Sequence, residues 1–214
     1  MKILAVSDKV LAQLYRSDVK RHYPGIELII GCGDLPYYYL EFLVSALDVR
    51  LFYVRGNHDV GPQYTIEGRI LKQVAGGVDI HASTARYNGL LMAGLEGSMR
   101  YRPNAPFMYS ETEMRANIAR LLPWLLRNRV KYGRYLDLLV THSPPFGIHD
   151  RSDLPHIGFK VFNSFLEWFK PRYMLHGHIH IYRHDTVRVT QQDATTIINV
   201  YPYRIVDIEL INKA

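Results

Sequence analysis

The sequence predicts an α/β fold in which strands and helices alternate and build two mixed β-sheets. In the first sixty residues, short apolar runs typical of buried strands alternate with segments whose apolar residues recur at helical spacing. This β-α-β-α-β order gives neighbouring parallel strands joined by right-handed crossovers. The rest of the chain holds further strand-like runs and two helical patterns, from which we expect a second sheet.

The first unit consists of three strands and two helices. Buried strands are predicted at three apolar runs, residues 2–6, 28–30 and 51–54. A helix is predicted after the first strand from three apolar residues at helical spacing, Leu11, Leu14 and Tyr15. Pro24-Gly25 breaks that pattern. Pro36 suits the first turn of the second helix, whose apolar face is expected to be Leu40, Leu43, Val44 and Leu47.

The middle of the chain contains two further strand-like runs and a long helix. The runs are residues 78–81 and 90–93. Ser110, followed by Glu113, forms a capping box that begins the helix. The inward face of the helix is expected to carry Met114, Ile118, Leu121 and Leu122. We expect Pro123 to restart or kink this helix and Gly133 to end it.

The last third predicts a strand, a helix, and three more strands. The first strand, residues 136–141, ends immediately before His142. A stiff Ser143-Pro144-Pro145 loop leads to a helix that stops at Pro171, with five apolar side chains inward, Val161, Phe162, Phe165, Leu166 and Phe169. Residues 172–175 form the next strand. Two strands near residues 195–199 and 204–210 are expected to complete the second sheet.

Composition favours a soluble protein of one domain. A chain of 214 residues can bury a core as one domain, residues 1–214. The amino terminus lacks the apolar core of a signal peptide, and no apolar run reaches the ~20 residues needed to span a membrane. We therefore expect a cytoplasmic protein with no membrane partner. The single cysteine, Cys32, excludes an internal disulfide and a thiolate zinc cluster, and we expect it to be a buried packing residue.

The net charge of +6 favours anionic partners. The Lys and Arg residues are scattered, without a basic run, so a solvated basic surface is favoured over a nucleic-acid track. Nucleic acid is therefore a possible partner but not the favoured one.

Short polar segments follow the predicted strands at six places. In order they are Asp8-Lys9-Val10, Gly33-Asp34, Gly56-Asn57-His58-Asp59, Thr141-His142, Gly177-His178 and His180. Each segment alone is weak evidence, since a Gly-Asp pair is usually a turn. Because ligands gather at the carboxyl ends of parallel strands, the segments are expected to face one crevice. Their carboxylate, amide and imidazole groups suit Mn, Fe, Co or Zn, and together they predict a two-metal hydrolytic centre.

This ordered set resembles the calcineurin-like metallophosphoesterases. The family pattern is D-x-H, G-D, G-N-H-[DE], H and G-H-x-H, and the chain matches it except at the first His, where Val10 stands. The most specific matches are Gly56-Asn57-His58-Asp59 and Gly177-His178-Ile179-His180. The resemblance implies a four-layer α/β/β/α sandwich. It also implies metal-dependent hydrolysis of a phosphoester, with a phosphodiester somewhat favoured over a monoester.

The resemblance also assigns the metal ligands. It implies two divalent cations, Mn, Fe, Zn or Co, bridged by Asp34. One cation would be completed by Asn57, His142 and His178. The other would be held by Asp8 and His180, and its remaining family ligand falls on Val10, whose isopropyl group donates nothing to a cation. We therefore expect one tightly bound and one weakly bound metal.

The catalytic and substrate-binding residues also follow from the resemblance. The nucleophile is expected to be a hydroxide that bridges the metals. His58 resembles the family's non-ligand histidine, a general acid or transition-state stabiliser. Asp59 either orients His58 or hydrogen-bonds its own loop. Arg100 and Tyr101 are candidate substrate-binding residues, because Arg pairs with phosphate and Tyr can stack on a base. A solvated loop is an equal alternative for this pair.

Polar residues outside the set receive structural interpretations. His176 is expected to be buried and hydrogen-bonded, without a place in the ligand list. His149, Asp150, Asp153 and His156 form a polar cluster after the Pro-Pro loop. A network that stabilises the loop is favoured for them over a role in lining the substrate cleft.

Three functions are compatible with these residues. The leading one is a phosphoesterase acting on a small-molecule or nucleotide phosphoester. The second is a non-catalytic scaffold that binds partners, as in a retromer subunit of this fold whose metal site has degenerated; Val10 points that way. The third is a nuclease or nucleic-acid binder, supported by the basic charge and the Arg-Tyr loop.

Overall fold

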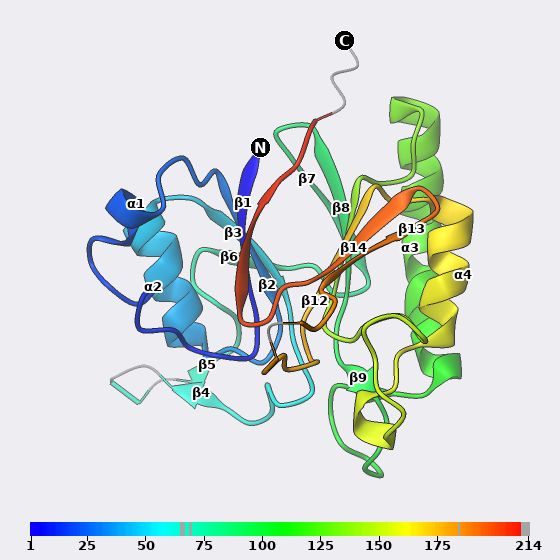
Figure 1. Cartoon of the computed structure of the whole chain (residues 1–214), viewed down its shortest axis with the longest axis horizontal. Helices are drawn as coiled ribbons and strands as arrows, with labels where there is room; N and C mark the ends of the chain where they lie inside the picture. Colours follow the sequence, from blue (N-terminus) through cyan, green and yellow to red (C-terminus); the bar gives the residue numbers. More distant parts are fainter. Residues whose placement is uncertain (65–66, 69, 184, 211–214) are drawn as a thin grey trace.

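Two mixed β-sheets pack face to face at the centre of the protein (Figure 1). The computed structural model describes residues 1–64, 67–68, 70–183 and 185–210. The first sheet contains, in spatial order, β15 (Tyr203–Asp207), β1 (Lys2–Val6), β2 (Leu28–Cys32), β3 (Arg50–Val54) and β6 (Gly77–Asp79). The second contains β13 (Val189–Gln192), β14 (Thr195–Asn199), β12 (Tyr173–His176), β11 (Leu138–Thr141), β8 (Leu90–Leu95) and β7 (Ser83–Tyr87).

Helices cover the outer face of each sheet. The first sheet is covered by α1 (Val19–His22) and α2 (Tyr37–Leu47), and the second by α3 (Glu111–Tyr132) and α4 (Lys160–Phe169) (Figure 1). The predicted four-layer sandwich with two mixed sheets is therefore confirmed. Short pairs of strands, β4 (Gln63–Tyr64) with β5 (Ile70–Leu71) and β9 (Ser98–Met99) with β10 (Met108–Tyr109), lie in the connections, as does a 3-10 turn, η1 (Leu154–His156).

Three hydrophobic clusters fill the three spaces between the layers. Successive residues of a strand point to opposite faces, so Ile3 packs between the two sheets while Leu4 packs against α1 and α2. In the same way, Met92 faces the first sheet and Leu91 faces α3 and α4. Burial of both faces explains why these strands read as continuous apolar runs rather than alternating ones.

The long helix α3 is one continuous element. The Ser110 hydroxyl accepts a hydrogen bond from the Glu113 amide, and the Glu113 carboxylate accepts one from the Ser110 amide, so the predicted capping box is confirmed. Gly133 ends the helix at φ 74°, as predicted. The helix does not restart at Pro123, which was one of the two expectations. Pro123 lies on the exposed side, where solvent can bond the carbonyl that the proline leaves unpaired.

Two sequence-based predictions are wrong. The last strand does not join the second sheet, because β15 pairs antiparallel with β1, with Ile205 opposite Leu4 (Figure 1). The helix predicted around Leu11 and Leu14 is reduced to a turn closed by hydrogen bonds to the Leu11 carbonyl, and α1 begins only at Val19. The apolar residues of β15 are buried by pairing with β1, so they do not need the second sheet. Leu11 and Leu14 pack in the cluster beside the first sheet, and a turn is enough to place them there.

The strands β1, β2 and β3 run parallel in one sheet, and β8, β11, β12 and β14 run parallel in the other. Their carboxyl ends bring loops from both sheets to one end of the sandwich.

Strand β7, between the two strands predicted for the middle of the chain, was not predicted from the sequence. Across the described part of the chain, no helix is long and apolar enough to cross a membrane.

Candidate metal centre

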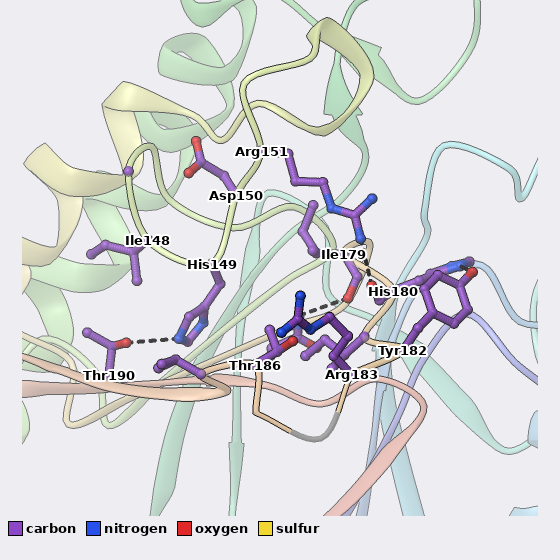
Figure 2. Close-up of a pocket in the computed structure, with 14 residues that line it drawn as sticks. Ile148, His149, Asp150, Arg151, Ile179, His180, Tyr182, Arg183, Thr186 and Thr190 are labelled. Atoms are coloured by element: carbon purple, nitrogen blue, oxygen red, sulfur yellow. Dashed lines mark hydrogen bonds between the residues drawn. The ribbon is translucent and has the colours of Figure 1, made fainter.

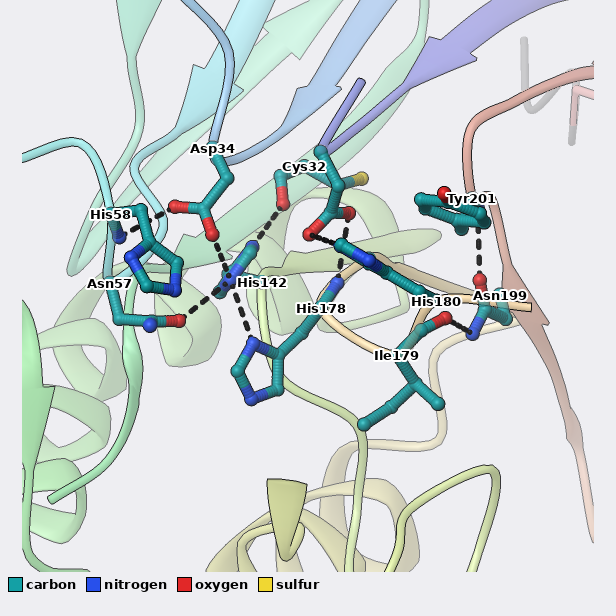
Figure 3. Close-up of polar contacts among 12 residues, drawn as sticks. Cys32, Asp34, Asn57, His58, His142, His178, Ile179, His180, Asn199 and Tyr201 are labelled. Carbon is teal, nitrogen blue, oxygen red and sulfur yellow. Dashed lines mark hydrogen bonds and ion pairs between the residues drawn. The ribbon is translucent and has the colours of Figure 1, made fainter. Parts of the chain in front are cut away.

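The polar segments predicted from the sequence meet at the carboxyl ends of the central strands. Asp8 follows β1. Asp34 and Asn57 follow β2 and β3, and His142 and His178 follow β11 and β12 (Figure 3). Backbone hydrogen bonds tie neighbouring loops together, from the Asp8 amide to the Gly33 carbonyl and from the Gly177 amide to the His142 carbonyl. Loops from the two sheets therefore bring these donors together at one end of the sandwich.

Four ligand-type donor atoms surround one point. The Nε2 atom of His142 lies 3.3 Å from Asp34 Oδ2, 3.0 Å from Asn57 Oδ1 and 3.1 Å from His178 Nδ1. The donor atoms of Asp34, His142 and His178 all lie within 4.8 Å of one another. Carboxylate, amide and imidazole donors at this separation fit a divalent cation of the first transition series.

Backbone carbonyls orient both imidazoles toward that point. His142 Nδ1 lies 2.7 Å from the Cys32 carbonyl oxygen, and His178 Nε2 lies 2.7 Å from the Pro155 carbonyl oxygen. A carbonyl only accepts, so each of these ring nitrogens carries a proton. The lone pair of the neutral ring is left on the nitrogen that faces the centre, which is the arrangement that metal-binding histidines adopt.

Without a cation, electrostatics place a proton on His142. Burial alone lowers the pKa of His142, but the Asp34 carboxylate outweighs it and raises the pKa to about 9. Burial alone raises the pKa of Asp34, but the His142 charge and the His58 amide lower it to about 2. Burial and the His142 charge lower the pKa of His178 to about 3. The metal-free cluster thus holds one positive charge where a cation would bind.

The second half of the centre is less complete. Asp8 Oδ2 accepts the His178 amide at 3.0 Å, while Asp8 Oδ1 is buried without a hydrogen-bond partner and lies 3.5 Å from His180 Nε2. An unpaired buried carboxylate oxygen is costly, and a cation would satisfy it. His180 is held by the Tyr182 hydroxyl, 3.0 Å from Nδ1, and by stacking on Tyr201 at 4.5 Å.

The ligand loops are strained and closely packed. Asp8, Asp34 and His178 have φ of 63°, 56° and 66°, a left-handed conformation that non-glycine residues adopt at a cost. A Cβ on Gly56 would overlap the Asp34 carboxylate and lie 2.7 Å from His142 Cε1. A Cβ on Gly177 would lie 2.6 Å from Asp8 Oδ2. Glycine is therefore required where the loops approach the donors.

A family model described as calcineurin-like phosphoesterase matches residues 4–182. The chain belongs to the calcineurin-like phosphoesterase family. Vps29 of Chaetomium thermophilum is 13% identical, with 97% of this chain and 82% of that chain covered and a TM-score of 0.41. SoxB of Thermus thermophilus, a sulfate thiohydrolase in complex with glycerol, is 14% identical, with 86% of this chain and 29% of that chain covered and a TM-score of 0.35. No curated protein matches the sequence.

At the position of the missing family histidine, Val10 lies in the hydrophobic layer. It is partly buried and packs against the cluster between the first sheet and helices α1 and α2. In the structure, Asp34, Asn57 and His178 meet at His142, while Asp8 lies near His180. Tyr182, which bonds to His180, was not predicted, because nothing in its sequence context marks it.

In the segment Gly56-Asn57-His58-Asp59, the last two residues have different surroundings. The His58 amide donates to Asp34 Oδ1 at 2.7 Å, and its side chain is exposed beside the centre (Figure 3). Asp59 Oδ2 accepts the amides of Gly56 at 2.7 Å and Asp34 at 2.8 Å. Burial and the Asp34 charge raise the pKa of Asp59 to about 7. These contacts favour loop bonding over orientation of the His58 ring.

The two candidate substrate-binding residues, Arg100 and Tyr101, have different surroundings in the structure. Asn57 Nδ2 donates to the Tyr101 hydroxyl at 3.2 Å, which places Tyr101 against a ligand residue. The Arg100 guanidinium instead donates to the Glu113 carboxylate at 2.8 Å and the Met108 carbonyl at 3.0 Å. Arg100 is therefore engaged at the start of α3.

The polar residues outside the ligand set bond to one another and to backbone groups. His176 is fully buried, and its Nε2 lies 3.0 Å from His149 Nδ1. Asp150 accepts the Gly158 amide at 3.1 Å, and Asp153 pairs with His156, as expected of a network that stabilises a loop. Cys32 is buried, and burial raises the pKa of its thiol.

Proposed function

We propose that this protein hydrolyses a phosphoester, preferentially a phosphodiester, with the help of two divalent cations. The observation that supports this most directly is the meeting of Asp34, Asn57 and His178 around His142 Nε2, with both imidazoles oriented by backbone carbonyls. These carboxylate, amide and imidazole atoms are the ligand types that a divalent cation of the first transition series takes.

We propose that the first cation binds Asp34, Asn57, His142 and His178, and the second binds Asp8, His180 and Asp34. When bound, the cations would neutralise phosphate oxygens and make hydroxide available near neutral pH. Asp34 Oδ1 accepts the His58 amide, and Oδ2 faces His142 Nε2, so the Asp34 carboxylate would help to hold the cations. Because Val10 packs in the hydrophobic cluster, the second cation has fewer ligands and is expected to bind more weakly.

We propose that His58 protonates or stabilises the leaving oxygen. Its amide donates to Asp34 while its ring is exposed, so the ring would be accessible to a phosphate held by the cations. Asp59 supports this by holding the two loops together through its bonds to Gly56 and Asp34. Tyr101 is proposed to contact substrate from its place beside Asn57. Arg100 could do so only after leaving Glu113.

We also propose that residues 1–214 form one domain, because the central hydrophobic cluster draws side chains from both sheets.

The second candidate function is a non-catalytic scaffold with a partly degenerate metal site. The apolar Val10 side chain, which packs against the hydrophobic cluster and offers no ligand atom, favours it.

The experiment is a Mn²⁺-dependent assay of bis(p-nitrophenyl) phosphate, with the bound metal counted in the same samples. His142→Ala should lose both metal and activity. His58→Ala should keep its metal but lose about 100-fold or more of kcat, the scale of a general-acid contribution. His22→Ala is the control, because His22 is exposed on α1, where it bonds to Asp18, and has no part in the proposed site. If the wild-type protein binds metal but hydrolyses neither phosphomonoesters nor phosphodiesters, the proposed enzymatic function is wrong and the scaffold function is favoured.

A further inference from the structure

A cavity of about 630 Å³ adjoins the weaker half of the metal centre (Figure 2). One wall is the loop Gly147–Arg151 after β11, and the opposite wall is the segment Ile179–Arg183 after β12. Thr190 of β13 and Asn199 of β14 close its base. This volume is in the range of about 300 to 1,000 Å³ typical of small-molecule sites, and far exceeds what a phosphate group alone fills.

The cavity wall and the metal-binding loop are the same stretch of chain. His180 lines the cavity, and its Nε2 faces Asp8 at 3.5 Å. Arg151 Nη2 donates to the His180 carbonyl at 2.8 Å across the cavity (Figure 2), and Asn199 Nδ2 donates to the Ile179 carbonyl at 2.9 Å. A molecule in the cavity would therefore lie directly beside the phosphate held at the metals.

A chain of hydrogen bonds makes one wall rigid and uncharged. His176 Nδ1 lies 3.0 Å from the Gly177 carbonyl, so it carries the proton and leaves Nε2 as an acceptor. His149 then donates from Nδ1 to His176 at 3.0 Å, and its Nε2 accepts from the Thr190 hydroxyl at 2.9 Å. Each ring therefore uses one nitrogen as a donor and the other as an acceptor, which is the pattern of a neutral imidazole. The chain holds His149 in its left-handed conformation at φ 60°.

The remaining lining suits a molecule with two parts, an uncharged ring and an anionic group at one end. Ile148, Ile181 and Val187 supply apolar surface, and Tyr182 supplies an exposed aromatic ring. The Asp150 carboxylate accepts the Gly158 amide. The guanidinium of Arg151 lies on the side of His180, where it can approach a phosphate.

We propose that this cavity binds the organic group of the phosphoester, an aromatic group of nucleoside size. The inference rests on the proposed phosphoesterase function and names its substrate class. The cavity then sets specificity, because the metals hold the phosphate while Ile148, Tyr182 and Val187 enclose the ring.

Two phosphodiesters with the same leaving group test this proposal, thymidine 5′-(p-nitrophenyl phosphate) and methyl p-nitrophenyl phosphate. Val187 is 64% exposed, so Val187→Trp can fill the cavity without entering the core. Val189→Trp is the matched control, because Val189 is 45% exposed and is absent from the lining. Val187→Trp should raise KM for the thymidine ester about tenfold or more and change kcat/KM for the methyl ester by less than about twofold. Val189→Trp should change neither.

An equal effect of Val187→Trp on both esters, or no effect on the thymidine ester, would overturn the proposal. Calorimetric binding of thymidine 5′-monophosphate in the presence of Mn²⁺ tests the role of the cavity in binding independently of hydrolysis. If wild type hydrolyses neither ester, the proposed function fails, and weaker binding by Val187→Trp than by Val189→Trp still supports the cavity. Equal binding by the two variants, or none by wild type, refutes it.

Discussion

Metal binding at this centre should compete with a proton on His142. In the metal-free protein, His142 has a pKa of about 9 because Asp34 outweighs the effect of burial, and the neutral His178 faces it at 3.1 Å. The cation needs the Nε2 lone pair, so binding must release that proton. Raising the pH is therefore the perturbation that should strengthen metal binding.

The magnitude follows from the distance between the pKa and the working pH. Because the pKa of His142 is about 9, its proton weakens the apparent affinity for the metal about 100-fold at pH 7. This corresponds to ~2.7 kcal/mol, at about 1.36 kcal/mol per pKa unit. Affinity should rise about tenfold per pH unit between pH 6.5 and 8.5, with one proton released per cation. Asp34, with a pKa of about 2, contributes nothing in this range.

The assay is a titration of metal-free protein with Zn²⁺ against a chromogenic chelator at several pH values. Calorimetry at pH 7 in two buffers of different ionisation enthalpy counts the released proton directly. His142→Asn is the comparison, because it removes the titrating ring; it should bind weakly with little pH dependence. An affinity for wild type that does not change between pH 7 and 8.5, without proton release, would refute the reasoning.

The same proton should stabilise the metal-free fold. The pKa of His142 in the folded state, about 9, lies above its ordinary value of about 6.5. The stabilisation is therefore fully present below pH ~6.5 and lost as the pH rises toward ~9. The urea midpoint of metal-free protein should fall over that window, and a midpoint that rises instead would contradict the sign.

Three substitutions give further predictions. Gly56→Ala should displace the Asp34 carboxylate and weaken binding of the more tightly bound metal about 100-fold. Gly94→Ala, which crowds core side chains instead, should lower stability and leave metal affinity unchanged. Equal loss of metal in the two variants, measured by elemental analysis, would contradict this. Val10→His should raise affinity for the weaker metal about tenfold or more, and an unchanged titration curve would show that position 10 does not reach the site. Ser110→Ala should cost about 1 kcal/mol of unfolding free energy by removing the cap of α3, and a midpoint unchanged in urea would count against it.

Local patterns in the sequence were sufficient for most elements. The apolar runs around Ile3, Ile29 and Phe52 predicted strands because both faces of each strand are buried. Ser110 and Glu113 predicted the start of α3, since a capping box uses residues three apart. These signals depend on neighbours in sequence, which a single chain displays directly.

The site was predicted in part for the same reason. Each donor follows a strand, and parallel strands end at one edge, so Asp34, Asn57 and His142 could be expected together. Their contacts with distant groups could not. Arg100 lies with Glu113 rather than facing the centre, and Tyr182 supports His180, because side-chain direction depends on what the fold brings nearby.

The sequence by itself determined the α/β order, the cap of α3 and the donor types that follow each strand. Only the tertiary structure decided that β15 pairs with β1, that Val10 lies among apolar side chains, and that the Cys32 carbonyl orients His142. Cys32 and His142 are 110 residues apart. Such contacts form only when two sheets pack against each other, so no periodicity or motif within one segment specifies them.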